Sequence, residues 1–134
     1  MRAVNLIIIH CSDSDIPAHD NIETIRKWHV DENKWSDIGY HFFIDKRGGV
    51  HPGRPEDVAG SHTKGHNSRS IGICLSGKKR FTPEQFKSLE LLCLKLTQKY
   101  NLDKKDILGH RDLNPGKTCP NFDIHTLISK WGWH

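Results

Sequence analysis

The run Val4-Asn5-Leu6-Ile7-Ile8-Ile9 decides what kind of fold this chain adopts. It is short, rich in β-branched residues and almost continuously apolar, which is the pattern of a central strand buried on both faces. Polarity returns abruptly at His10, Cys11 and Ser12. The sequence therefore predicts a buried first strand, with a histidine at its exit that can point into a cleft.

Strand and helix signals alternate along the rest of the chain. Apolar runs bounded by turn residues predict further strands at residues 40–45, 50–51, 70–75 and 106–108, with a shorter one at 58–59. Capping residues and apolar spacing predict helices over residues 20–33, 82–100 and 123–131. The chain is thus predicted to be α/β, a single domain over residues 1–134 with a central mixed β-sheet flanked by about three helices.

Three local signals add detail to these elements. Asp20, with Glu23 three positions later, resembles the N-cap of the first predicted helix. Thr82 and Gln85 resemble a capping box at the start of the second. Gly72 lies inside a predicted buried strand, which indicates that another part of the chain approaches its backbone closely.

Composition narrows the class of protein. The 134 residues are 35% hydrophobic and 27% charged, with a formal net charge of +4, which is typical of a folded domain and too weakly basic to indicate nucleic acid. No apolar run approaches the roughly 20 residues that a membrane span needs. We interpret Met1 to Ile9 as a strand and not as a signal peptide, so we expect a protein that stays in the cytoplasm unless something releases it.

The stretch from Gly109 to Pro120, GHRDLNPGKTCP, carries the candidate chemistry. His110 and Cys119 lie nine positions apart, and both side chains are good zinc ligands. Pro115-Gly116 can bend the chain between them, without a helix or strand, and bring them together. A catalytic metal needs a third protein ligand, and we favour His10 because a buried strand would hold it rigidly. The other candidates are His19, His29, His41, His51, His62, His66 and His125. From spacing alone, a loop histidine beside a buried cysteine without any metal stays an equal alternative.

The four cysteines are scattered, with no closely spaced pair, which argues against a disulfide framework in a cytoplasmic protein. Cys74 and Cys93 lie in apolar surroundings and are expected to be small buried hydrophobic residues. Cys119 or Cys11 with a histidine would also suit a cysteine peptidase, which is kept as a minor alternative.

Five stretches together resemble a known family. In chain order they are Ile8-Ile9-His10-Cys11-Ser12, Ile38-Gly39-Tyr40-His41-Phe42, Gly60-Ser61-His62 with Asn67, Ser70 through Gly77, and Gly109 through Pro120. The chain is similar to the zinc-dependent N-acetylmuramoyl-L-alanine amidases of type 2, a family that includes phage lysozyme-like amidases and animal peptidoglycan-recognition proteins. The resemblance implies the peptidoglycan-recognition fold and one Zn²⁺ per chain, with His10, His110 and Cys119 as metal ligands.

The same resemblance implies roles for further residues. Tyr40 and Lys117 would be catalytic, because a hydroxyl can orient a zinc-bound water or relay its proton, and a fixed ammonium can stabilise an oxyanion. His62 and Asn67 fall in a loop that resembles the substrate groove, so we expect them to bind substrate. Arg111 and Asp112 are expected to hold the metal-binding loop in place.

The resemblance also implies a biological setting. We expect hydrolysis of the amide between N-acetylmuramic acid and L-alanine in peptidoglycan, by a phage or prophage endolysin that reaches the cell wall after the membrane is permeabilised. The partner would be peptidoglycan, with no nucleic acid, no membrane insertion and a monomeric chain. The alternative is a peptidoglycan-binding protein of the same fold without activity, which the presence of Cys119 disfavours.

Overall fold

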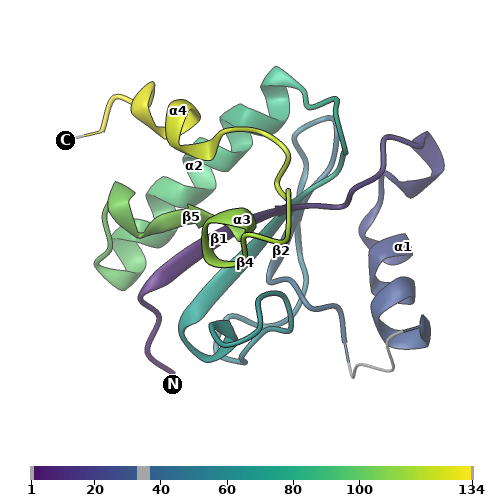
Figure 1. Cartoon of the computed structure of the whole chain (residues 1–134), viewed down its shortest axis with the longest axis horizontal. Coiled ribbons are helices and arrows are strands. Elements are labelled where there is room, and N and C mark those ends of the chain that lie inside the picture. The colour runs from purple at the N-terminus through teal and green to yellow at the C-terminus, as the bar shows by residue number, and fades with distance from the viewer. Residues whose placement is uncertain (1, 33–36, 134) are drawn as a thin grey trace.

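The computed structural model describes residues 2–32 and 37–133. In these residues a five-stranded mixed sheet forms the centre of the molecule (Figure 1), with the strand order β3-β2-β4-β1-β5. The strands are β1 (Leu6–Cys11), β2 (Phe42–Ile44), β3 (Val50–Pro52), β4 (Ser70–Leu75) and β5 (Ile107–Gly109). β1 pairs in parallel with β4 and β5, β2 pairs in parallel with β4, and β3 is antiparallel to β2. The predicted α/β class and mixed sheet are confirmed.

The strand predicted at residues 58–59 is wrong. This segment lies in the long connection between β3 and β4. The carbonyl of Val58 accepts a hydrogen bond from the His41 ring at 2.8 Å, and that of Ala59 accepts one from Arg54 at 2.8 Å. Side chains therefore satisfy the carbonyls that a strand partner would otherwise bind.

Four α-helices occur in the described residues: α1 (Ile22–Lys27), α2 (Pro83–Tyr100), α3 (His110–Leu113) and α4 (Ile124–Ser129). The predicted capping box of α2 is confirmed, because Thr82 accepts from the amide of Gln85 and Gln85 accepts from the amide of Thr82. α1 is capped by Asn21 and not by Asp20, whose carboxylate instead accepts from the amide of Lys46 at 2.9 Å. The predicted end of this first helix, Asn33, lies outside the described residues. α3 corrects the prediction of a loop with no helix after Gly109.

The sheet has two differently covered faces. α2 and α4 lie on one side and α1 on the other (Figure 1). Because side chains alternate along a strand, Ile7 and Ile9 pack into the larger core under α2 and α4, whereas His10 and its β4 neighbour Cys74 share the face on which α1 lies. The smaller cluster on that face contains Ile25, Ile38, Phe43 and Cys74. The buried strand thus sends its exit histidine away from the main core.

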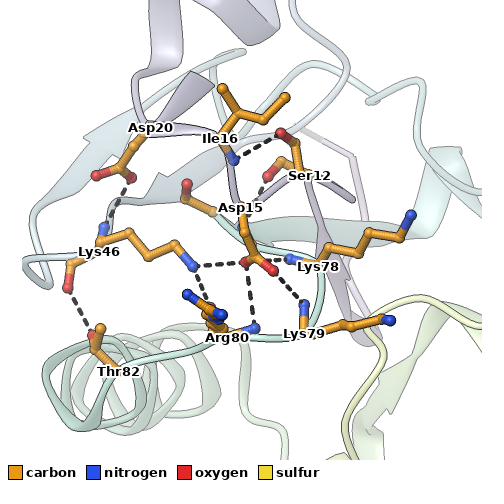
Figure 2. A network of polar contacts seen from close by, with 12 residues as sticks. Ser12, Asp15, Ile16, Asp20, Lys46, Lys78, Lys79, Arg80 and Thr82 are labelled. Atoms are coloured by element: carbon orange, nitrogen blue, oxygen red, sulfur yellow. Dashed lines mark hydrogen bonds and ion pairs between the residues drawn. The ribbon is translucent and has the colours of Figure 1, made fainter. Parts of the chain in front are cut away.

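A charged network connects the loops that follow β1, β2 and β4 (Figure 2). The Asp15 carboxylate accepts hydrogen bonds from the backbone amides of Lys78, Lys79 and Arg80 at 2.9, 2.9 and 3.3 Å, and from the Lys46 ammonium at 2.9 Å. Desolvation by burial is the largest single influence on the pKa of Asp15 and raises it, but the four hydrogen bonds together outweigh it and hold the pKa far below its usual value. The loop after β4 is therefore fixed to the loop after β1, close to the exit of β1.

No helix among the described residues is long and apolar enough to cross a membrane.

Candidate metal centre

The three predicted metal ligands come together at one end of the sheet. β1 and β5 are parallel neighbours, so their carboxyl ends meet where α3 begins (Figure 1). His10, near the end of β1, therefore lies beside His110, the first residue of α3. The two imidazole rings are 4.5 Å apart between centroids. The turn after α3 then returns Cys119, whose carbonyl accepts from the amide of Arg111 at 2.9 Å.

The geometry of this cluster suits a tetrahedral metal. One ligand atom each of His10, His110 and Cys119 lies within 4.8 Å of the others. Zn–N and Zn–S bond lengths place ligand atoms about 3.3 to 3.6 Å apart in a tetrahedral site. The three ligand atoms thus lie within about 1.5 Å of the separations that such a site needs. Two histidines with one cysteine form the open, three-ligand type of shell.

The backbone of Cys11 holds the side chain of Cys119. Its sulfur accepts a hydrogen bond from the backbone amide of Cys11 at 2.9 Å. The neighbouring Cys11 thiol and burial raise the pKa of Cys119, so the group keeps its proton in the absence of a cation. A divalent ion displaces such a proton, which makes binding at this site dependent on pH.

His10 is almost fully buried, with an exposed fraction of 1%, and burial holds its pKa well below the usual value for histidine. Its Nε2 atom lies 2.9 Å from Nδ1 of His62 and 3.2 Å from the hydroxyl of Thr63. Within the described part of the chain, the structure gives no hydrogen bond to its Nδ1 atom. A neutral imidazole with one free nitrogen is the form that binds a metal.

Lys117 lies close enough to affect His110. The pKa of His110 is lowered by burial and then by the positive charge of Lys117. Lys117 itself is exposed, and its backbone amide closes a turn onto the carbonyl of Asn114 at 2.9 Å. His110, Asn114 and Lys117 line a hollow of about 380 Å³ together with part of the 61–67 loop. The structure thus brings a cation to the edge of the metal centre.

Tyr40 also contacts His10, and it lies in the residues that lead into β2. Its ring centroid is 5.0 Å from that of His10 and 5.3 Å from that of His29. Burial raises the pKa of Tyr40, and the nearby sulfurs of Cys74 and Cys119 raise it further. The phenol therefore keeps its proton and can act as a hydrogen-bond donor at neutral pH.

His62 and Asn67 lie beside the centre, and their polar atoms already form hydrogen bonds within the protein. The Asn67 side-chain oxygen accepts from the backbone amides of His62 and Thr63 at 2.8 and 2.9 Å, which shapes the loop. The Nε2 atom of His62 lies 3.2 Å from the hydroxyl of Ser70. Both residues line the hollow beside Lys117, and their role as substrate contacts stays a prediction.

Sequence reasoning missed Thr63 and Ser70, because a hydroxyl residue at a loop or strand start carries no signal of its own. The close approach expected at Gly72 is confirmed, since a Cβ atom there would lie 2.7 Å from the His62 ring. The Gly72 amide also donates to Nδ1 of His41 at 3.0 Å, and Nε2 of His41 donates to the carbonyl of Val58, so this histidine has a structural role.

Asp112 holds the metal-binding loop, as predicted. Its carboxylate accepts from the amide of Gly109 and from Nε2 of His125, both at 2.8 Å. The first contact ties α3 to the end of β5, and the second ties it to α4. The position of His110 is therefore fixed from both neighbouring elements.

Comparisons with known proteins show the family of this chain. Residues 1–122 match the N-acetylmuramoyl-L-alanine amidase family. The endolysin of Klebsiella phage KP32 is 38% identical over 126 residues, which cover 88% of this chain and 81% of that protein. The amidase LysC from Clostridium intestinale URNW is 34% identical, with a TM-score of 0.85 over 96% of this chain and 85% of that one. A complex of the peptidoglycan recognition proteins PGRP-LCa and PGRP-LCx bound to tracheal cytotoxin gives a TM-score of 0.80 at 27% identity, over 98% of this chain and 84% of that one. This chain therefore belongs to the N-acetylmuramoyl-L-alanine amidase family.

Proposed function

We propose that this chain hydrolyses the amide bond between N-acetylmuramic acid and L-alanine in bacterial peptidoglycan, using one Zn²⁺ held by His10, His110 and Cys119. The observation that carries the proposal is the meeting of these three side chains, from β1, α3 and the turn after it, with ligand atoms within 4.8 Å of one another. Family membership supports the reaction, and the polar hollow beside the cluster supplies room for a substrate.

When bound, zinc would polarise the scissile carbonyl and lower the pKa of a water molecule to near neutrality. The Lys117 ammonium, at the edge of the hollow beside His110, would stabilise the negative charge that develops on the amide oxygen. Removing one such donor in other enzymes costs about 3 to 4 kcal/mol in the barrier. The protonated Tyr40 hydroxyl would orient the attacking water by hydrogen bonding or relay its proton. His62 and Asn67 would border the substrate from the facing loop.

The biological setting is part of the same proposal. A chain related to phage endolysins would be made in a bacterial cytoplasm and reach the wall after the membrane is permeabilised. We propose that it acts as a monomer, without nucleic acid and without inserting into a membrane. Its net charge of +4 would favour approach to an anionic wall, and this effect weakens as salt is added.

The decisive experiment digests purified peptidoglycan with the protein, with and without a chelator, while bound zinc is measured. We expect new amino groups from L-alanine, no new reducing sugar ends, one zinc per chain, and loss of activity in chelator. Cys119→Ser should lose zinc and activity together. Cys93→Ala, which removes a thiol on the buried face of α2, is the matched control and should keep both.

Three results would redirect the assignment. Reducing ends in place of amino groups would mean a glycosidase. Binding to insoluble peptidoglycan without any released product would favour the non-catalytic alternative. Activity that resists chelator but is lost on alkylation would favour a cysteine peptidase.

A further inference from the structure

We propose that His62 is a positioning residue of the metal centre, and that a directed chain of hydrogen bonds from His10 through His62 and Ser70 leaves Nδ1 of His10 as the atom that binds the metal. The inference rests on the proposed zinc site. It concerns which nitrogen of His10 carries the proton, a property that the ligand set alone does not fix.

The direction of this series of hydrogen bonds follows from its end at Ser70 and the carbonyl of His66. The Ser70 hydroxyl lies 2.8 Å from the carbonyl oxygen of His66, and a carbonyl can only accept, so Ser70 donates its proton there. The same hydroxyl lies 3.2 Å from Nε2 of His62 and has no second proton to give. His62 must therefore donate from Nε2.

A neutral imidazole with its proton on Nε2 has a lone pair on Nδ1. Nδ1 of His62 faces Nε2 of His10 at 2.9 Å, so the proton between them belongs to His10. The Thr63 hydroxyl lies 3.1 Å from Nδ1 of His62 and 3.2 Å from Nε2 of His10, and it can serve either as donor or as acceptor. It therefore fits this direction. With its proton on Nε2, His10 presents the lone pair of Nδ1.

The His62 ring cannot turn to reverse the chain. On one side the backbone of Gly72 lies so close that a Cβ atom there would be 2.7 Å from the ring. The backbone of His62 is held by the Asn67 side chain through the contact at 2.8 Å. Gly60 also approaches the ring, since its Cβ position lies 2.6 Å from Cδ2 of His62. The hydrogen bonds from His10 through His62 to Ser70 are therefore held in this arrangement without a bound metal.

The ring nitrogen of a metal-bound histidine that faces away from the metal usually donates to a fixed acceptor, and loss of that acceptor typically weakens metal binding 10- to 100-fold. Here the acceptor is another histidine, itself oriented by a serine and a carbonyl. The expected consequence of removing it is weaker zinc binding with the three ligands still present.

Two variants of similar size test the two nitrogens of the His62 ring separately. His62→Asn keeps an oxygen near the position of Nδ1, where it can accept from His10. His62→Gln keeps an amide near the position of Nε2 and leaves His10 without its acceptor. Both place a polar amide in the same partly buried site, so we expect matched folding penalties, and thermal unfolding checks this. His51→Gln, a histidine that pairs with Asp45 away from the centre, is the control.

Zinc dissociation constants are measured by competition with a chelating dye, on full-length protein. We expect His62→Gln to bind zinc about 10- to 100-fold more weakly than the wild type, by the typical loss for such partners, and His62→Asn to stay much closer to the wild type. Equal weakening in both variants, or none in His62→Gln, would overturn the inference.

Nitrogen-15 NMR of the zinc-loaded wild type reads the proton position directly. We expect His10 to carry its proton on Nε2 and to bind the metal through Nδ1, and His62 to be protonated on Nε2. A wild type that binds zinc through Nε2 of His10 would overturn this inference and leave the proposed function intact. A wild type that binds no zinc would overturn the proposed function itself.

Discussion

Replacing Gly72 with alanine tests how closely the sheet and the metal centre depend on each other. The new Cβ atom would lie 2.7 Å from Cγ and Cδ2 of the His62 ring and 2.9 Å from its Nδ1. Ordinary contact between such atoms requires more than 3.4 Å, so the ring must retreat by about 0.7 Å or the strand must bend. The ring has little freedom to move, because its two nitrogens lie 2.9 Å from His10 and 3.2 Å from Ser70.

The expected cost has two parts of opposite sign. Overpacking a well-filled site destabilises by about 1 to 3 kcal/mol. Replacing glycine with alanine recovers about 0.4 to 1 kcal/mol, because the unfolded chain loses conformational freedom. We therefore expect Gly72→Ala to lower the free energy of unfolding by about 1 to 2 kcal/mol.

Urea denaturation in the presence of a chelator measures this change without any contribution from bound metal. Gly132→Ala is the matched control, because its Cβ position has no heavy atom within 4 Å, and we expect its stability to stay within about 0.5 kcal/mol of the wild type. Zinc binding by Gly72→Ala should weaken as well, since the displaced ring faces His10. Wild-type stability together with wild-type zinc affinity would refute the reasoning.

Three further changes have distinct readouts. Lys117→Ala should slow amide hydrolysis by about 10²- to 10³-fold with zinc content unchanged, and an unchanged rate would remove its role. Asp15→Asn should destabilise the fold by about 2 kcal/mol in urea at pH 7, as expected for lost hydrogen bonds to a charged group; because the pKa of Asp15 is depressed, the deficit should shrink as pH falls below about 3.9. Burial lowers the pKa of His41 to about 4. The unfolded chain therefore takes up that proton first, so stability should fall between about pH 6.5 and 4, and less steeply in His41→Gln.

Local features of the fold could be predicted from sequence because they depend on neighbours along the chain. Nearly continuous apolar runs with β-branched residues mark β1 and β4, and the capping box at Thr82 and Gln85 marks the start of α2. Such signals fail where a distant group competes for the same side chain. Asp20 resembled a helix cap, but it accepts from the amide of Lys46, and Asn21 caps α1 in its place.

In the candidate site, too, some features could be predicted from sequence and others depend on the tertiary structure. Sequence alone supplied the identities of His10, His110 and Cys119, because their residue types and family order are written in the chain. Only the tertiary structure decided that these three meet, since this depends on β1 and β5 being parallel neighbours. The contacts of Ser70 with His62 and of His62 with His10 are likewise evident only from the tertiary structure. The physical reason is that periodicity fixes which face a side chain takes, whereas these contacts depend on how the 61–67 loop folds back on the sheet and on strand order and register. No local pattern encodes those features, and the His10–His62 contact joins residues 52 positions apart.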